Sequence, residues 1–306
     1  MGSGMRKNVI GAVLAMFFCL PSFQGSRAAA ATGAPATDAG AAAVEPPAEE
    51  TLRALSERGR AVGAGIVGTA KAREKLARQG QGIAKADGVI ATLDHDLWHI
   101  LFLKDREAEP APGMPRSGTL VLAETEYGEA ADDVGSLRVM SPPRPATSTM
   151  VSTLRAVQIA LTEAGSRSKP ETPFDLASFR ERDGTFTIYL LPQGAGNGPA
   201  RFGGDFVVRV MSSGRQVMTV DAAHSTTTDV PLAGRAAGQP SLHSHASGDL
   251  PTVGDVALVR MHPSLAPHLV LTPHSIFRID AEGSITWLGP NPVPGSAPSV
   301  PSGSRP

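Results

Sequence analysis

The sequence predicts an α+β fold, a mixed β-sheet with flanking helices, and three observations carry this prediction. Residues Ser148 to Ala164 place their apolar side chains on one stripe of a helix. Two hairpin signals follow, at Asp183-Gly184 and at 212–215, each between strand-like runs. A short strand carrying two histidines then precedes a helix that begins at Thr252. We therefore expect residues 146–289 to form one α+β domain with the histidine strand inside its sheet.

Residues 1–30 have the three regions of a secretory signal. Basic residues precede an apolar run from Val9 to Leu20, and small residues follow at Ala28 to Ala30. The apolar run is too short to span a bilayer. We therefore expect a periplasmic or secreted protein with no membrane insertion once the signal is removed. The only cysteine, Cys19, lies inside this segment, so the mature chain would have no thiol and no disulfide.

Composition limits the remaining functions. The formal net charge is -1, which gives no electrostatic reason to expect nucleic acid or an anionic membrane as a partner. The chain contains 33 glycines and 26 prolines, many for a compact domain. Much of this excess lies in residues 31–48 and 290–306, which we expect to be a disordered linker and tail.

Residues 49–145 are predicted to form a separate, small region of helix and strands. The segment from Glu49 to about Ala86 has a helical composition, but four glycines between positions 59 and 68 interrupt it. Each glycine costs roughly 1 kcal/mol in a helix interior relative to alanine. This pattern predicts two helices, or one frayed helix, docked on the following strands.

The stretch from Ser241 to Met261 carries residue types that bind metals. His243 and His245 are two apart in a predicted strand, so both imidazoles lie on one face. Asp255 falls in the first turn of the helix that begins at Thr252. Two imidazoles, one carboxylate and a water would form the open tetrahedral site of a catalytic zinc ion. The spacing of Thr252 and Asp255 also has an ordinary interpretation, because it matches a helix-capping box that needs no metal.

This stretch resembles the signature of the JAB/MPN (JAMM) metalloprotease superfamily, in which a strand with H-x-H is followed by a turn and by S-x-x-D at a helix start. His243 and His245 match the two histidines, Thr252 stands in place of the family's serine, and Asp255 matches the third ligand. The turn is six residues long here, whereas the family usually has seven. The resemblance covers about the last third of the chain. It implies a zinc-dependent peptidase or isopeptidase that acts on a peptide or protein through metal-activated water, with Thr252 beside the ion.

The resemblance also implies a glutamate base from an early strand after the first helix of the domain. Glu171 is best placed by its order in the chain, and Asp175 is a weaker alternative. The glycine-rich context that follows the family's glutamate is missing. Further histidines at positions 262, 268 and 274 have irregular spacing, and nothing in the sequence selects one as a neighbour of the site.

Two hypotheses of different class stay open. The first is an exported JAMM-type zinc peptidase. The second is a non-catalytic envelope protein that keeps the JAB-like fold and binds a protein partner through its N-terminal region. The sequence contains no nucleophile elbow, no H-E-x-x-H helix and no phosphate-binding loop that would favour another chemistry.

Overall fold

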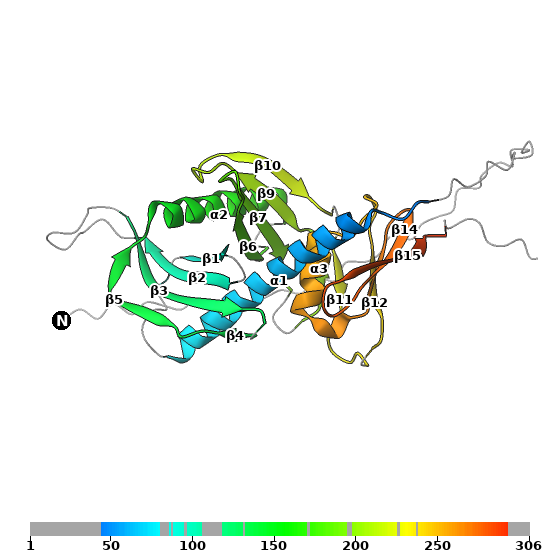
Figure 1. Cartoon of the computed structure of the whole chain (residues 1–306), viewed down its shortest axis with the longest axis horizontal. Coiled ribbons are helices and arrows are strands. Elements are labelled where there is room, and N and C mark those ends of the chain that lie inside the picture. The colour runs from blue at the N-terminus through cyan, green and yellow to red at the C-terminus, as the bar shows by residue number, and fades with distance from the viewer. Residues whose placement is uncertain are drawn as a thin grey trace, which may run out of the picture. The chain divides into compact units, whose positions relative to one another are not determined.

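The computed structural model describes residues 44–79, 86, 88–94, 97–105, 118–130, 132–169, 172–194, 198–224, 227–236 and 238–292. The predicted signal peptide and most of the predicted linker and tail lie outside these residues. Figure 1 shows that the described chain combines helices with mixed β-sheets, so the predicted α+β class is confirmed. Among the described helices, none is both long and apolar enough to cross a bilayer.

A nine-stranded sheet, called the large sheet below, has the order β10-β9-β7-β6-β1-β2-β3-β4, with β5 paired to β3. Its strands are β1 (Gly88–Asp94), β2 (Leu97–Asp105), β3 (Thr119–Gly128), β4 (Asp133–Val134), β5 (Arg138–Pro145), β6 (Phe174–Arg180), β7 (Phe186–Pro192), β9 (Phe206–Val210) and β10 (Val217–Ala222). The two predicted hairpins are present as β6–β7 and β9–β10. Strands β1 and β6 are parallel and share one register pair, Thr92 with Ser178, and the Ser178 hydroxyl donates to the Ala91 carbonyl at 2.7 Å.

The large sheet crosses the boundary that the sequence predicts at residue 145. Strands β1 to β5 lie before this boundary and the other strands lie after it, yet they form one sheet. Residues from Val44 onward accordingly form a single compact unit. The prediction of a separate region at 49–145 is therefore wrong, because the β1–β6 pairing joins the two halves.

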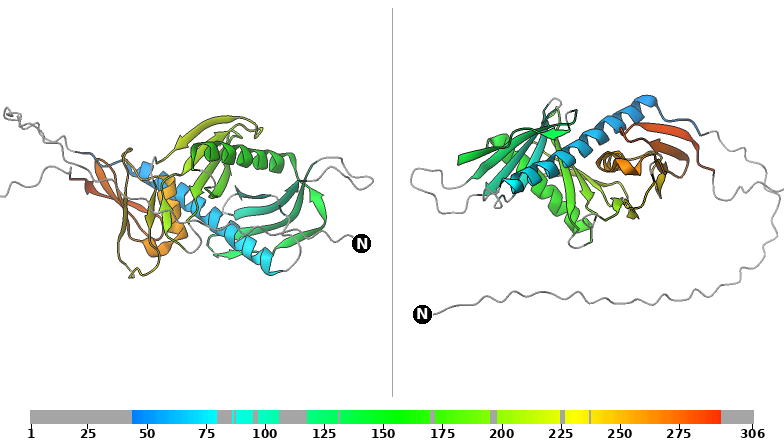
Figure 2. Two further views of the ribbon diagram at one scale, coloured as in Figure 1. Left: turned by 180° about the vertical axis from the view of Figure 1, so that it is seen from behind. Right: turned by 90° about the horizontal axis from the view of Figure 1, so that it is seen from below.

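Two helices cover opposite faces of the large sheet. Helix α1 (Glu49–Arg78) packs on one face with a core that includes Trp98 and Phe179. Helix α2 (Ser148–Arg167) packs on the other face, against residues such as Ile188. The Thr147 side chain caps α2 by accepting a hydrogen bond from the Met150 N–H. Figure 2 shows the N-terminal half of α1 continuing beside β15 (Ile285–Pro290) of a second sheet, where the Ser56 hydroxyl accepts the Ile285 N–H at 3.2 Å.

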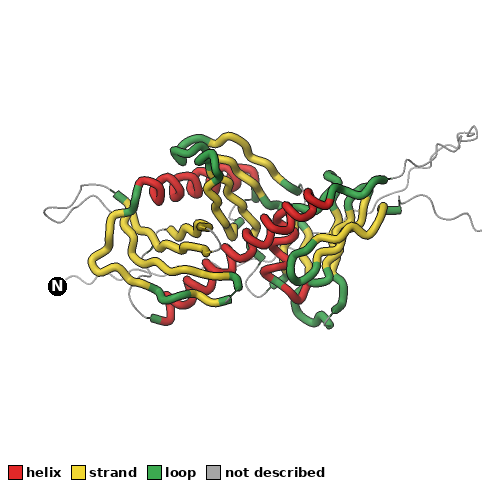
Figure 3. The backbone as a smooth tube through the Cα atoms, viewed as in Figure 1, coloured by secondary structure: helices red, strands yellow, loops and turns green. Residues whose placement is uncertain are grey.

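Helix α1 runs without a break, as its continuous red tube in Figure 3 shows, so the predicted interruption at its glycines is wrong. These glycines mark the close contacts of the helix. A Cβ at Gly59 would lie 2.4 Å from the Cβ of Val256 in helix α3 (Val253–Met261). A Cβ at Gly65 would lie 2.7 Å from the Trp98 ring, and a Cβ at Gly68 would lie 2.6 Å from the Tyr127 ring. Packing that only glycine permits outweighs the low helix propensity of this segment.

Two smaller sheets follow in the chain. Strands β8 (Ala200–Phe202) and β11 (Thr228–Val230) form a two-stranded sheet. The small sheet, with the order β12-β13-β14-β15, contains β12 (Ser241–Ser244), β13 (His268–Leu271), β14 (Ser275–Ile279) and β15 (Ile285–Pro290). Helix α3 and a 3-10 turn (Pro263–Leu265) connect β12 to β13, which are parallel. The histidine strand thus lies at the edge of a separate sheet, which corrects the prediction that places it inside the main sheet.

Candidate metal centre

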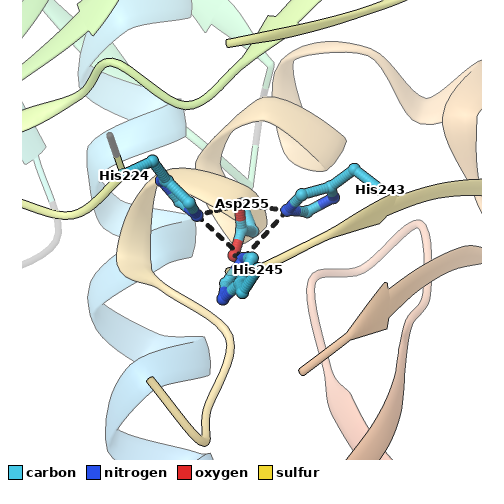
Figure 4. A group of neighbouring side chains, drawn as sticks. All are labelled: His224, His243, His245 and Asp255. Atoms are coloured by element: carbon cyan, nitrogen blue, oxygen red, sulfur yellow. Dashed lines mark hydrogen bonds and ion pairs between the residues drawn. The ribbon is translucent and has the colours of Figure 1, made fainter. Parts of the chain in front are cut away.

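Four side chains converge near the N-terminus of α3: His224, His243, His245 and Asp255 (Figure 4). One ligand atom from each lies within 4.8 Å of all the others. His224 follows β10 of the large sheet, whereas the other three residues come from β12, the residue after it and α3. The structure therefore brings together the three ligands proposed from sequence and adds a fourth from another sheet.

The alternation of β12 aims both of its histidines the same way. Ser241, His243 and His245 are buried, while Leu242 and Ser244 between them are exposed. The two imidazole Nε2 atoms lie 2.9 Å apart. A strand has a side-chain period of two, so these residues share the face that packs toward α3.

Asp255 caps its helix and reaches the imidazoles with the same carboxylate. Its Oδ2 accepts the Thr252 N–H at 2.7 Å, and the Thr252 hydroxyl oxygen accepts the Asp255 N–H at 3.1 Å. Its Oδ1 lies 3.1 Å from Nε2 of His243, and Oδ2 lies 3.1 Å from Nε2 of His245. The capping and ligand interpretations of the sequence therefore do not exclude each other. Thr252, predicted to stand beside the ion, is placed as the N-cap that orients Asp255.

The carboxylate of Asp255 is held in its charged form. Its side chain is only 1% exposed. Burial by itself would raise the pKa of Asp255, but hydrogen bonds and positive charge from protonated imidazoles at His243 and His245 lower that pKa well below its usual range. When the imidazoles are neutral and present lone pairs, as metal ligands must, a cation takes the place of those protons. A charged carboxylate in this position is a ready ligand for a cation.

Sequence reasoning missed His224. Its Nε2 lies 2.8 Å from Nε2 of His245, 21 residues away in the chain, and 4.0 Å from Oδ1 of Asp255. The sequence predicts a surface loop at 222–240, and a single histidine in a polar loop carries no spacing signal. The distance is set by the approach of β10 to the small sheet, which only the tertiary structure reveals.

Asp205 supports His224 from behind. Its Oδ1 lies 2.7 Å from Nδ1 of His224, so this nitrogen donates, and in the neutral imidazole Nε2 then presents its lone pair to the cluster. Burial lowers the pKa of His224, but the hydrogen bond to Asp205 and the charges of Asp255 and Asp205 raise it above its ordinary value overall. A histidine that donates its second N–H to a carboxylate is the usual arrangement behind a metal ligand.

A chain of hydrogen bonds orients His243 in the same sense. The Ser241 hydroxyl oxygen lies 2.6 Å from the Leu265 carbonyl and 2.5 Å from Nδ1 of His268. A carbonyl only accepts, so the hydroxyl donates to it and His268 Nδ1 donates to the hydroxyl. His268 Nε2 then accepts from Nδ1 of His243 at 2.7 Å. His243 Nε2 is left as a lone pair that faces the cluster.

The surroundings of His268 keep its imidazole neutral, which the hydrogen bonds from Ser241 to His243 require. Burial lowers the pKa of His268 to about 3. The ring of Phe202 stacks on both His243 and His268, with centroids 4.6 and 4.4 Å away. These contacts fix the planes of both imidazoles and exclude water from them.

The resulting cluster consists of hydrogen-bond acceptors that face one another. Oδ1 of Asp255 is buried and has no hydrogen-bond partner among the described residues, because the nearby Nε2 of His243 also presents a lone pair. Buried acceptors without donors are costly, and a cation removes that cost. The separations given above run from 2.8 to 4.0 Å, and no two of the four ligand atoms are more than 4.8 Å apart. They bracket the edge of roughly 3.3 Å expected for a tetrahedron with bonds of about 2.0 Å. The group can hold a metal ion.

The residues proposed as bases are not part of this cluster. Glu171 lies outside the described residues. Asp175 lines a separate cavity of about 230 Å³ with Gln193 and His262, and its Oδ1 accepts from the Gln193 amide at 2.6 Å. Burial raises the pKa of Asp175 and lowers that of His262. Besides Asp255, the described structure places the carboxylate of Asp205 next to the centre, and Asp205 is engaged with His224.

Comparison of the chain with protein-family models, with curated proteins and with solved structures gives no match. The resemblance of residues 241–261 to the JAMM signature therefore stays a prediction.

Proposed function

We propose that the protein is an exported zinc-binding protein in which His224, His243, His245 and Asp255 hold one ion. The observation that carries the proposal is the pair Asp205 and His224, since it presents a fourth nitrogen already oriented by a carboxylate. Three imidazoles and one carboxylate suit zinc, which prefers four nitrogen, oxygen or sulfur ligands. A bound ion would neutralise the cluster and tie the large sheet to the small sheet.

The number of protein ligands favours a non-catalytic role. Structural zinc sites use four protein ligands, whereas catalytic sites keep one coordination position open. His224 would take the fourth coordination position, for which the sequence predicts a water. All four side chains are nearly inaccessible, and His224 is the most exposed at 8%. The favoured function is therefore an envelope protein whose metal holds the fold for binding a protein partner.

Metal analysis of the purified chain tests this proposal. We expect one zinc ion per chain, and we expect His243→Ala to lose it. His274→Ala is the matched control, because His274 is exposed and does not belong to the cluster. Chelation should lower the melting temperature of the wild type and leave that of His243→Ala unchanged, since a ligand stabilises only the state that binds it. A chain that contains no metal after purification and does not take up zinc would refute the proposal.

A JAMM-type peptidase is the second candidate, and one observation favours it. The ligands lie on a strand, a turn and a capped helix in the order of that family, and α3 leads from β12 into the parallel strand β13. Such an enzyme needs an open coordination position, which requires His224 to be displaced.

Cobalt substitution separates the two candidates. In the closed site, the visible spectrum of the Co²⁺ protein should not respond to added acetohydroxamate, whereas the Co²⁺ form of His224→Ala should respond. If the wild-type spectrum already shifts with acetohydroxamate, the site is open and the peptidase candidate is preferred.

A further inference from the structure

A cavity of about 790 Å³ lies on the α2 face of the large sheet, apart from the metal centre. Helix α2 packs mainly on β1, β6, β7, β9 and β10, so the same face of β2, β3 and β5 is left to this cavity beside the helix N-terminus (Figure 1). The volume falls within the range of roughly 300–1,000 Å³ that is typical of small-molecule sites. Neither the fold nor the metal centre uses this space.

The floor of the cavity is apolar. Ile90 and Leu101 are buried side chains of β1 and β2, and Met150 comes from the first turn of α2. Hydroxyl groups surround this floor, and that of Thr153 is already used in a hydrogen bond to a backbone carbonyl. A ligand body in contact with this floor has to be largely apolar.

One end of the cavity carries an excess of positive charge. Arg138 and Arg144 both pair with the single carboxylate of Glu124, and the Arg144 to Glu124 distance is 2.6 Å. The Glu124 side chain is 18% exposed, that of Arg144 is 36% exposed and that of Arg138 is 71% exposed, so Glu124 and Arg144 are the better enclosed members of this cluster. Two guanidinium groups share ten N–H donors, and one carboxylate cannot satisfy them. The first turn of α2, whose Thr147 and Thr149 line the same end, has no acidic residue to offset the helix dipole.

A carboxylate and an imidazole face each other at the other end. Glu126 lies opposite His99 on neighbouring strands, and its Oε1 is 3.3 Å from the His99 Nδ1. The cavity therefore has an apolar floor, a cationic end and, at the opposite end, a carboxylate in contact with an imidazole.

We propose that this cavity binds a small amphipathic carboxylate, with the head at Arg144 and Arg138 and the aliphatic body over Ile90, Leu101 and Met150. Arginine is suited to this role because its planar group can take a second carboxylate edge while it stays paired with Glu124. Glu124 acts as an internal competitor that holds the arginines in position. This site is independent of the metal proposal.

Calorimetric titration of the full chain with decanoate tests the proposal, with decanol, decyltrimethylammonium and acetate as comparison ligands. We expect decanoate to bind at least 10-fold more tightly than decanol or acetate, and the cation not to bind. Arg144→Gln should weaken decanoate binding at least 10-fold. Glu124→Gln should strengthen it several-fold, because it removes the competing carboxylate without changing the shape of the side chain. Arg155→Gln, an exposed arginine elsewhere on α2, should change nothing.

Arg144→Gln and Glu124→Gln are expected to change decanoate affinity in opposite directions, and this distinguishes ligand recognition from support of the fold. If Arg144 and Glu124 only support the fold, both substitutions lower affinity together, and the proposal is wrong. Equal affinity for decanol and decanoate, or no decanoate binding up to millimolar concentration, also overturns it. Circular dichroism and thermal melts establish that each variant is folded. If Arg144→Gln does not fold, the Glu124→Gln result and the decanol comparison still decide the question.

Discussion

A Cβ added to Gly254 would lie 2.5 Å from Oδ2 of Asp205, so the start of α3 and the carboxylate behind His224 touch only because residue 254 is glycine. We expect Gly254→Ala to push Asp205 away from His224 and to lower zinc affinity about 10-fold or more, although all four ligands remain. Competition with a chromophoric chelator measures this. Gly165→Ala is the control, since no atom lies within 4 Å of its added Cβ. It should leave affinity unchanged and stabilise α2 by up to about 1 kcal/mol.

The hydroxyl of Ser241 should affect zinc affinity although it is not a ligand itself. Ser241→Ala removes the acceptor that fixes the tautomer of His268, and through it the lone pair of His243. We expect zinc affinity to fall about 10- to 100-fold. Ser244→Ala, an exposed serine of the same strand, is the matched control and should have no effect. Equal affinities of the two variants would show that the hydrogen-bond chain does not orient His243.

The contact between α1 and α3 predicts a pair of compensating substitutions. Gly59→Ala places a methyl group 2.4 Å from the Cβ of Val256, and we expect it to destabilise the protein by about 1–3 kcal/mol. Val256→Ala alone should also destabilise, because it leaves a cavity in the core. In the double variant the new methyl fills part of that space, so the loss should be smaller than the sum of the two single losses. Urea denaturation of the four proteins checks this cycle.

Buried Asp175 predicts a stability effect that depends on pH. Burial raises its pKa above the unfolded value of 3.8, so its favourable contribution is present below that value and is lost as pH rises through the folded pKa. Asp175→Asn keeps an oxygen that can accept from Gln193 and removes the buried charge. We expect a higher melting temperature than wild type at pH 7 and a difference that shrinks toward pH 4. A difference that is constant from pH 4 to pH 7 would contradict the charge explanation.

His262 lines the same cavity as Asp175, and its effect on stability depends on pH in the opposite direction. Burial lowers the pKa of His262 below 6.5, so its contribution to stability is present above 6.5 and is lost as pH falls through the folded pKa. His262→Gln should therefore make stability less sensitive to pH between 7 and 5. Thermal melts across this interval, compared with those of the exposed His274→Gln, measure the change.

Local spacing accounts for what the sequence predicted well. The alternation of Ser241, His243 and His245 and the capping pair Thr252 and Asp255 are short-range patterns, and the structure places these side chains together. Helix α2 could be predicted for the same reason, because a single apolar stripe defines it. Hairpins β6–β7 and β9–β10 follow from their turn residues.

Long-range packing accounts for what the sequence did not predict. His224, Asp205 and His268 reach the centre from separate segments, and no spacing rule connects them. The glycines of α1 indicated a broken helix because their partners, such as Val256, are about two hundred residues away in the chain. The pairing of β1 with β6 joins two regions that composition separates.

The bridge from His224 to His245 has a consequence for the unfolded chain. With a single cysteine, this chain cannot form an internal disulfide. An ion held by these two residues closes a loop of 21 positions. In the chain-entropy model a covalent closure of about 15 residues is worth about 3 kcal/mol, because it restricts the denatured ensemble. At the proposed zinc site, a cross-link of this length would be opened by a chelator and closed again by adding zinc, so a single preparation of the protein could be studied with the loop open and with the loop closed.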